Sequence, residues 1–156
     1  MKLYKAARKY RKKLESNLSG KGILFEHILD CEQVAELKNN WLTHFAAGIK
    51  TSDIYIDEFM WNIFSYKRLS CSAGDEAAAQ FLLQAKTQCY ILFEHHKDAY
   101  YLENAASLTQ DDLIDGIDFE SKDLYVVSKR FNWTYVLTHE SDCGPYYYHK
   151  KMFNKQ

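Results

Sequence analysis

The sequence predicts an α+β fold in a single domain of 156 residues. Residues before position 87 repeat apolar side chains at helical spacing, whereas residues 87–149 form short runs rich in tyrosine and β-branched residues, separated by polar turns. We therefore expect about four helices from the N-terminal half to pack on one face of an antiparallel sheet. About five strands from the C-terminal half would form this sheet.

The chain begins with a basic segment. Leu3, Ala7, Tyr10, Leu14 and Leu18 form an apolar stripe of helical period, which Gly20 ends. Seven of the 20 basic side chains precede the first acidic residue, so 13 basic and 21 acidic side chains follow. We expect residues 1–20 to form a basic helix that docks on an acidic body. The alternative is a separable arm that binds nucleic acid or a membrane surface.

Residues 21–86 are predicted to be mainly helical. Residues 22–29 fit either a strand or a packed loop. Asp30 is a helix N-cap candidate, and the apolar face that follows it predicts the most secure helix of the chain. Further helices are predicted over about Asp57–Tyr66 and over Asp75–Lys86.

Residues 87–149 are predicted to be mainly strands. The strongest strand pattern is residues 133–139, where Trp133, Tyr135 and Leu137 lie on one face and alternate with Thr134, Val136 and Thr138 on the other. If helices cover one face of the sheet, the bare face carries the tyrosines.

Composition predicts a cytoplasmic location. No apolar run approaches the length of a membrane span, and the basic N-terminus leads into a polar segment instead of a signal core. The four cysteines are dispersed without a C-x-x-C pair, so we expect reduced thiols and neither a metal nor a cofactor.

Three motifs carry a resemblance to a known family. They are residues 61–66 (WNIFSY), residues 102–105 (LENA) and residues 131–136 (FNWTYV), the last followed by Cys143-Gly144-Pro145-Tyr146. Over about residues 37–148 the chain resembles an uncharacterised family of small domains from Bacillus and related bacteria. The family more often has histidine where this chain has Asn62, so no metal or acid–base role is transferred to that position. The resemblance implies a bacterial source but no reaction.

The loop after residue 138 has the best set of residues for chemistry. It contains His139, Glu140, Asp142 and Cys143, which a hydrolase or a metal-dependent enzyme could use. The neighbouring carboxylates disfavour a reactive thiolate at Cys143. The simpler interpretation is that His139 and Glu140 anchor the turn by hydrogen bonds.

We expect a non-enzymatic domain that binds another protein, in the manner of an immunity protein. The partner would be basic, because an acidic stretch adjoins tyrosine-rich strands, and tyrosine is favoured at contact surfaces. The candidate contacts are Asp111, Asp112, Asp115, Asp118, Glu120, Trp133, Tyr135 and Tyr146. The first alternative to protein binding is the enzyme described above, and the second is nucleic acid binding through the basic helix. The sequence also allows a homodimer.

Overall fold

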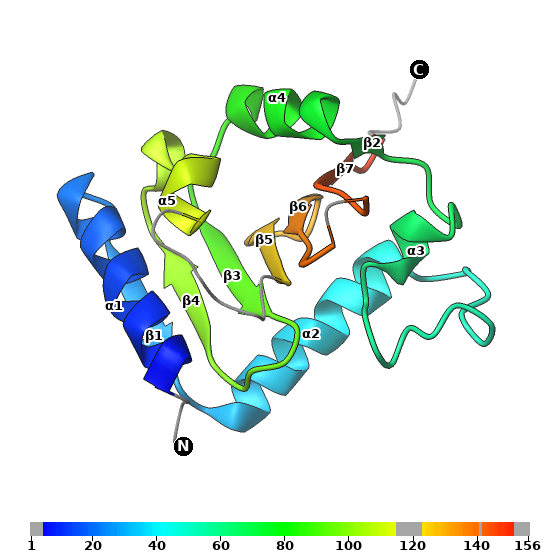
Figure 1. Cartoon of the computed structure of the whole chain (residues 1–156), viewed down its shortest axis with the longest axis horizontal. Coiled ribbons are helices and arrows are strands. Elements are labelled where there is room, and N and C mark those ends of the chain that lie inside the picture. Colours follow the sequence, from blue (N-terminus) through cyan, green and yellow to red (C-terminus); the bar gives the residue numbers. More distant parts are fainter. Residues whose placement is uncertain (1–4, 115–122, 141, 152–156) are drawn as a thin grey trace.

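The computed structural model describes residues 5–114, 123–140 and 142–151, and these residues form a seven-stranded antiparallel sheet with helices on both faces (Figure 1). The strand order is β1-β4-β3-β5-β6-β7-β2. The strands are β1 (Phe25–Ile28), β2 (Ser72–Ala73), β3 (Cys89–Phe93), β4 (Ala99–Leu102), β5 (Leu124–Ser128), β6 (Trp133–Leu137) and β7 (Tyr146–His149). The predicted α+β class is confirmed. The predicted strand count was too low, because β1 and β2 at the two edges come from the N-terminal half.

The helices are divided between the two faces of the sheet. They are α1 (Lys5–Gly20), α2 (Cys31–Phe45), α3 (Asn62–Ser65), α4 (Asp75–Leu83) and α5 (Gln110–Ile114), with a 3-10 turn at Ala105–Ser107. Residues of α1, α4 and α5 pack in one hydrophobic core, and residues of α2 and α3 pack in the other. The prediction of one covered face was therefore wrong. Within the described ranges, no helix is both long and apolar enough to cross a bilayer.

Strands β5 and β6 are buried along their whole length. The predicted alternation in β6 is confirmed: Trp133 and Tyr135 lie in the core under α1 and α4, and Val136 lies in the core under α2. Thr134 also faces α2, where it accepts a hydrogen bond from Trp41 Nε1 at 3.0 Å and donates one to a backbone oxygen of β5. A threonine satisfied in this way is compatible with full burial, so a polar residue in the pattern did not mark an exposed face.

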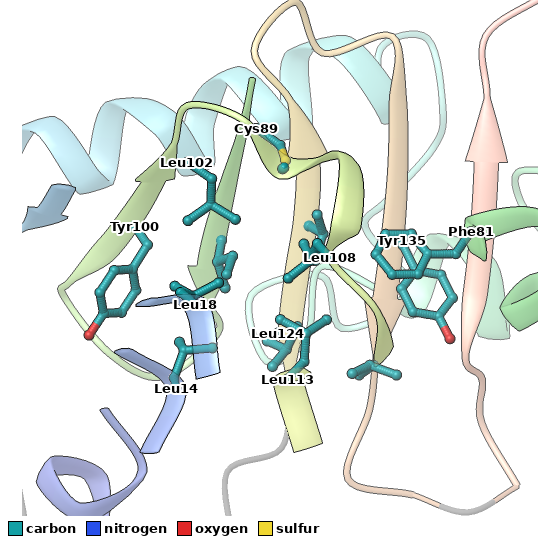
Figure 2. Packing of buried hydrophobic residues seen from close by; sticks show 14 of the residues in the cluster. Leu14, Leu18, Phe81, Cys89, Tyr100, Leu102, Leu108, Leu113, Leu124 and Tyr135 are labelled. Atoms are coloured by element: carbon teal, nitrogen blue, oxygen red, sulfur yellow. The ribbon is translucent and has the colours of Figure 1, made fainter. Parts of the chain in front are cut away.

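The first core joins α1 and α4 to the sheet (Figure 2). Leu14 and Leu18 of α1 are fully buried there. Phe81 of α4 stacks on Tyr135 with ring centroids 4.1 Å apart and an interplanar angle of 5°. The predicted docking of the basic helix is thus observed, since residues of α1 pack in the first core.

A buried ion pair also fixes α1. Arg11 Nε lies 2.7 Å from Asp98 Oδ2, which also lies 2.7 Å from His27 Nε2. Burial raises the pKa of Asp98, but the hydrogen bonds from Arg11 and His27 outweigh it and hold the pKa well below its usual value. The other cations of α1, namely Lys5, Arg8, Lys9, Lys12 and Lys13, are exposed.

Two local predictions have opposite outcomes. Asp30 caps α2 as expected, because its side chain accepts hydrogen bonds from the backbone N–H groups of Glu32 and Gln33. The helix predicted over Asp57–Tyr66 was largely wrong, since only Asn62–Ser65 is helical. Just before this segment, Tyr55 has a φ of 54°, which is outside the helical range. Within it, the backbone N–H groups of Met60 and Trp61 donate to the side chains of Glu94 and Tyr125.

Candidate binding site

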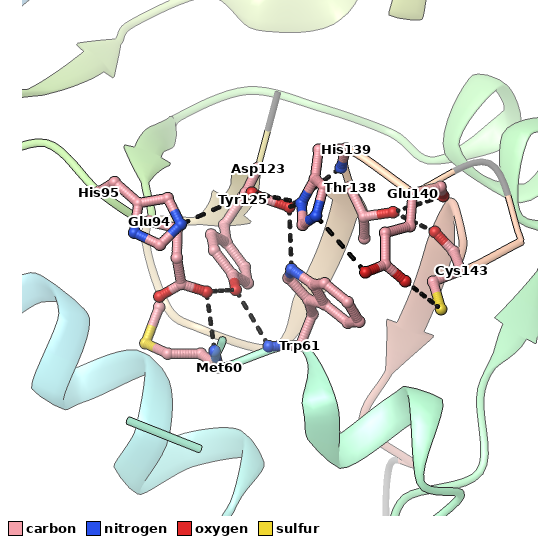
Figure 3. A network of polar contacts seen from close by, with 10 residues as sticks. All are labelled: Met60, Trp61, Glu94, His95, Asp123, Tyr125, Thr138, His139, Glu140 and Cys143. Atoms are coloured by element: carbon pink, nitrogen blue, oxygen red, sulfur yellow. Dashed lines mark hydrogen bonds and ion pairs between the residues drawn. The ribbon is translucent and has the colours of Figure 1, made fainter. Parts of the chain in front are cut away.

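A buried carboxylate, Asp123, lies at the centre of a polar cluster at one end of the sheet (Figure 3). Leu124 of β5 pairs with Leu137 of β6, so Asp123 before β5 meets His139 after β6. Asp123 accepts hydrogen bonds from Trp61 Nε1 at 3.0 Å and from the backbone N–H of His139 at 3.0 Å. His139 Nδ1 lies 2.9 Å from Asp123 Oδ2. The carboxylate therefore connects β5, β6 and the segment before α3, although Asp123 was not among the predicted site residues.

Glu94, which follows β3, anchors the same segment. Its Oε1 accepts a hydrogen bond from Met60 N at 2.7 Å and another from the Tyr125 hydroxyl. Tyr125 Oη in turn accepts one from Trp61 N at 3.0 Å. Burial raises the pKa of Glu94 to about 7, against the opposing effect of these hydrogen bonds. The backbone at Met60 and Trp61 is thus held by the side chain of Glu94, just after β3, and by that of Tyr125 in β5.

The predicted catalytic residues lie together, but no contact between Cys143 and His139 is found among the described residues. The Cys143 thiol donates to Glu140 Oε2 at 3.4 Å, and Glu140 Oε1 lies 3.5 Å from His139 Nε2. Burial raises the pKa of Cys143, and Glu140 and Asp142 raise it further. A protonated thiol bound to a carboxylate is a poor nucleophile. Across the described residues, no three His, Cys, Asp or Glu side chains are arranged to hold a metal ion.

The turn that carries these residues is held by its own hydrogen bonds. Thr138 Oγ1 donates to the backbone oxygen of Glu140 at 3.0 Å and also to that of Cys143, and Cys143 N donates to the backbone oxygen of Glu140 at 3.1 Å. His139 makes its hydrogen bonds to Asp123 and not within the turn. The simpler interpretation, in which His139 and Glu140 anchor the turn, agrees only in part with these contacts: Thr138 holds the turn, and Glu140 takes part through its backbone oxygen.

A pocket of about 360 Å³ opens beside the cluster, and we call it the aromatic pocket. Tyr55 is 64% exposed and Tyr66 46% exposed, whereas Trp61 is buried. The residues that line it are Tyr55, Glu58, Phe59, Trp61, Asn62, Ser65, Tyr66, Glu140 and Cys143. It thus has four aromatic rings, two carboxylates and no lysine or arginine in its described lining, a composition that fits a cationic group.

A larger hollow of about 620 Å³ shares Ser65 and Cys143 with the aromatic pocket. Its lining includes one cation, Lys67, and one carboxylate, Asp142. These opposite charges give the hollow no clear preference for the charge of a ligand.

The predicted acidic contacts are only partly within the described residues. Asp111 is exposed on α5. Asp112 forms an ion pair with Lys21 at 2.6 Å and accepts a hydrogen bond from Thr109 N at 2.8 Å, so it stabilises the start of α5. Asp115, Asp118 and Glu120 lie outside the described residues.

The predicted aromatic contacts are core residues. Trp133, Tyr135 and Tyr146 are all buried, because helices cover both faces of the sheet. Among the described residues, the exposed tyrosines are Tyr55, which precedes the buried helix predicted over Asp57–Tyr66, and Tyr66, the last residue of that predicted helix. The apolar pattern of this segment did not indicate that the two tyrosines are exposed. The acidic residues near Tyr55, namely Asp53, Asp57 and Glu58, are consistent with an exposed loop.

Comparison with known proteins gives a family but no activity. The model of the family described as Domain of unknown function (DUF4275) matches residues 13–147. The chain belongs to this family. The match begins within α1, so the resemblance extends further toward the N-terminus than the sequence motifs indicated. No curated protein and no solved structure matches the chain.

Proposed function

We propose that this member of the DUF4275 family is a non-enzymatic bacterial protein-binding domain that recognises a basic partner in the cytoplasm, as an immunity protein recognises a toxin. The observation that carries the proposal is the exposure of Tyr55 and Tyr66 beside the carboxylates of Glu58 and Glu140. Exposed tyrosines supply large, rigid contact area, and carboxylates select a positively charged partner. The proposed contact surface is the aromatic pocket instead of the acidic stretch and strand tyrosines expected from the sequence. The expected partner is a basic protein in both cases.

The two alternative functions have less support. A cysteine hydrolase would need a thiolate activated by a neighbouring histidine, whereas the Cys143 thiol contacts Glu140, which raises the pKa of the thiol. Nucleic acid would bind the exposed cations of α1, but the pocket of about 370 Å³ there is lined by lysine and arginine without an aromatic ring in its described lining. Stacking on aromatic rings is the usual way to hold single-stranded bases.

Immobilised peptide libraries of basic, neutral and acidic composition test the proposal. The protein should retain basic peptides at low salt and release them at about 0.5 M salt, because screening weakens exposed charge contacts. The variant Glu58→Gln/Glu140→Gln should lower the affinity about tenfold. A matched control, Glu26→Gln/Glu36→Gln, removes the same charge from exposed positions on β1 and α2 and should bind as the natural protein does. Equal retention of acidic peptides, or an equal loss in the control variant, contradicts the proposal.

A further inference from the structure

We infer that the aromatic pocket receives one arginine side chain of the partner. The inference rests on the proposed function, because it names the group by which a basic partner is recognised. Three features of the pocket support it: its stacked rings, its available carboxylates and the lack of a competing cation in the lining that the structure describes.

The rings form a wall in which Tyr55, Phe59 and Tyr66 are accessible to a flat cation, whereas Trp61 is buried and supports Phe59 by stacking on it. Phe59 and Trp61 stack with centroids 4.9 Å apart and an interplanar angle of 23°. Asp123 fixes Trp61 through the indole N–H, and Glu94 and Tyr125 fix the backbone on either side of the Met60–Trp61 peptide bond. The wall is therefore formed before a ligand arrives, which lowers the entropic cost of binding.

The carboxylates can accept further hydrogen bonds. No hydrogen bond or ion pair to the carboxylate of Glu58 is found within the described ranges. Glu140 Oε2 accepts only a weak thiol bond, from Cys143, and Glu140 Oε1 lies 3.5 Å from His139 Nε2. By contrast, the Asn62 amide is already used, because it donates to Tyr55 O at 3.1 Å and accepts from Ser65 Oγ at 3.1 Å. Charge recognition in the pocket thus falls to the two glutamates.

This combination favours arginine over lysine. A guanidinium group is planar, stacks on aromatic faces and presents several N–H donors at once, so it can contact a ring and a carboxylate together. An ammonium group is a more strongly hydrated point charge and gains less from a flat ring. The neutral isostere citrulline keeps the shape of arginine without the charge, which makes it a matched negative probe.

Titration of the ¹⁵N-labelled protein with N-acetyl-argininamide tests the inference by NMR. The indole signal of Trp61 and the side-chain amide signal of Asn62 should shift and saturate in the millimolar range, while the indole signals of Trp41 and Trp133, in the two cores, stay fixed. N-acetyl-lysinamide should bind at least about threefold more weakly, and N-acetyl-citrullinamide should leave the signals unchanged.

Two variants localise the effect. Tyr55→Ala/Tyr66→Ala removes exposed rings, and Glu58→Gln/Glu140→Gln removes the charges. Each should weaken argininamide binding about tenfold, while the thermal unfolding midpoint stays close to that of the natural protein because the exposed side chains contribute little to the core.

The outcomes separate this inference from the proposed function. Equal binding of lysinamide, binding of citrullinamide, or the absence of a shift at Trp61 overturns the arginine pocket. If basic peptides are still retained in that case, the protein-binding function stands and its contact lies elsewhere. If basic peptides are not retained either, both are wrong.

Discussion

Replacing Glu94 with glutamine should change how stability depends on pH. The side chain lies between β3 and the segment before α3, where its Oε1 accepts hydrogen bonds from Met60 N and from the Tyr125 hydroxyl. Burial raises its pKa from 4.5 to about 7. An amide oxygen in Glu94→Gln can accept the same two hydrogen bonds, so the variant removes the charge while it keeps the contacts.

The size of the expected change in unfolding free energy follows from the shift in the pKa of Glu94. A raised pKa means that the folded state binds the proton more tightly, so this contribution to stability is complete below the unfolded pKa and is lost as pH rises through the folded pKa. With each pKa unit worth about 1.4 kcal/mol, the natural protein should lose about 3 kcal/mol of unfolding free energy between about pH 4 and pH 8 from this group. Glu94→Gln should not lose this contribution.

The assay is urea unfolding of both proteins at several pH values, with the difference in unfolding free energy plotted against pH. Subtraction cancels the titration of the other groups. The control variant Glu36→Gln alters an exposed residue of α2 and should follow the natural protein. A difference curve for Glu94→Gln that stays flat within about 1 kcal/mol refutes the argument that burial controls this carboxyl. Argininamide binding should persist in the variant, because the wall of the aromatic pocket keeps its hydrogen bonds.

Two further predictions concern the first core. Asp98→Ala leaves the guanidinium of Arg11 buried without its counter-charge, so urea unfolding should show a loss of about 3 to 5 kcal/mol. Asp53→Ala, which breaks an exposed ion pair, should cost far less than Asp98→Ala, and equal losses in the two variants would contradict the role of burial. Phe81→Ala removes the ring stacked on Tyr135 and should cost about 3 to 5 kcal/mol by the same measurement. A loss below about 1 kcal/mol would show that α4 contributes little to the core.

Much of the secondary structure was predictable from local pattern. The Asp30 cap and the apolar face that follows it specify α2, and the alternation from Trp133 to Leu137 specifies β6. The start of α4 at Asp75 also matches its prediction, although the helix ends at Leu83 instead of Lys86. These features depend on contacts between neighbours in the sequence, so a single sequence contains the necessary information.

The candidate site was only partly predictable. The loop after β6 was expected to be a turn anchored by His139 and Glu140, but Thr138 and backbone groups hold it instead, while His139 binds Asp123. Its partners Asp123, Trp61 and Glu94 come from three other segments, and nothing in the local pattern links them to His139. The expected contact residues Tyr135 and Tyr146 proved to be buried.

The sequence by itself determined the α+β class and the amphipathic character of α1, because composition and periodicity encode them directly, and its motifs indicated the uncharacterised family to which the chain belongs. Only the tertiary structure decided that helices cover both faces of the sheet, and therefore which tyrosines remain exposed. Burial is a property of the whole assembly: the same tyrosine is a core residue under α4 or a contact residue in a loop, depending on which distant segment packs against it.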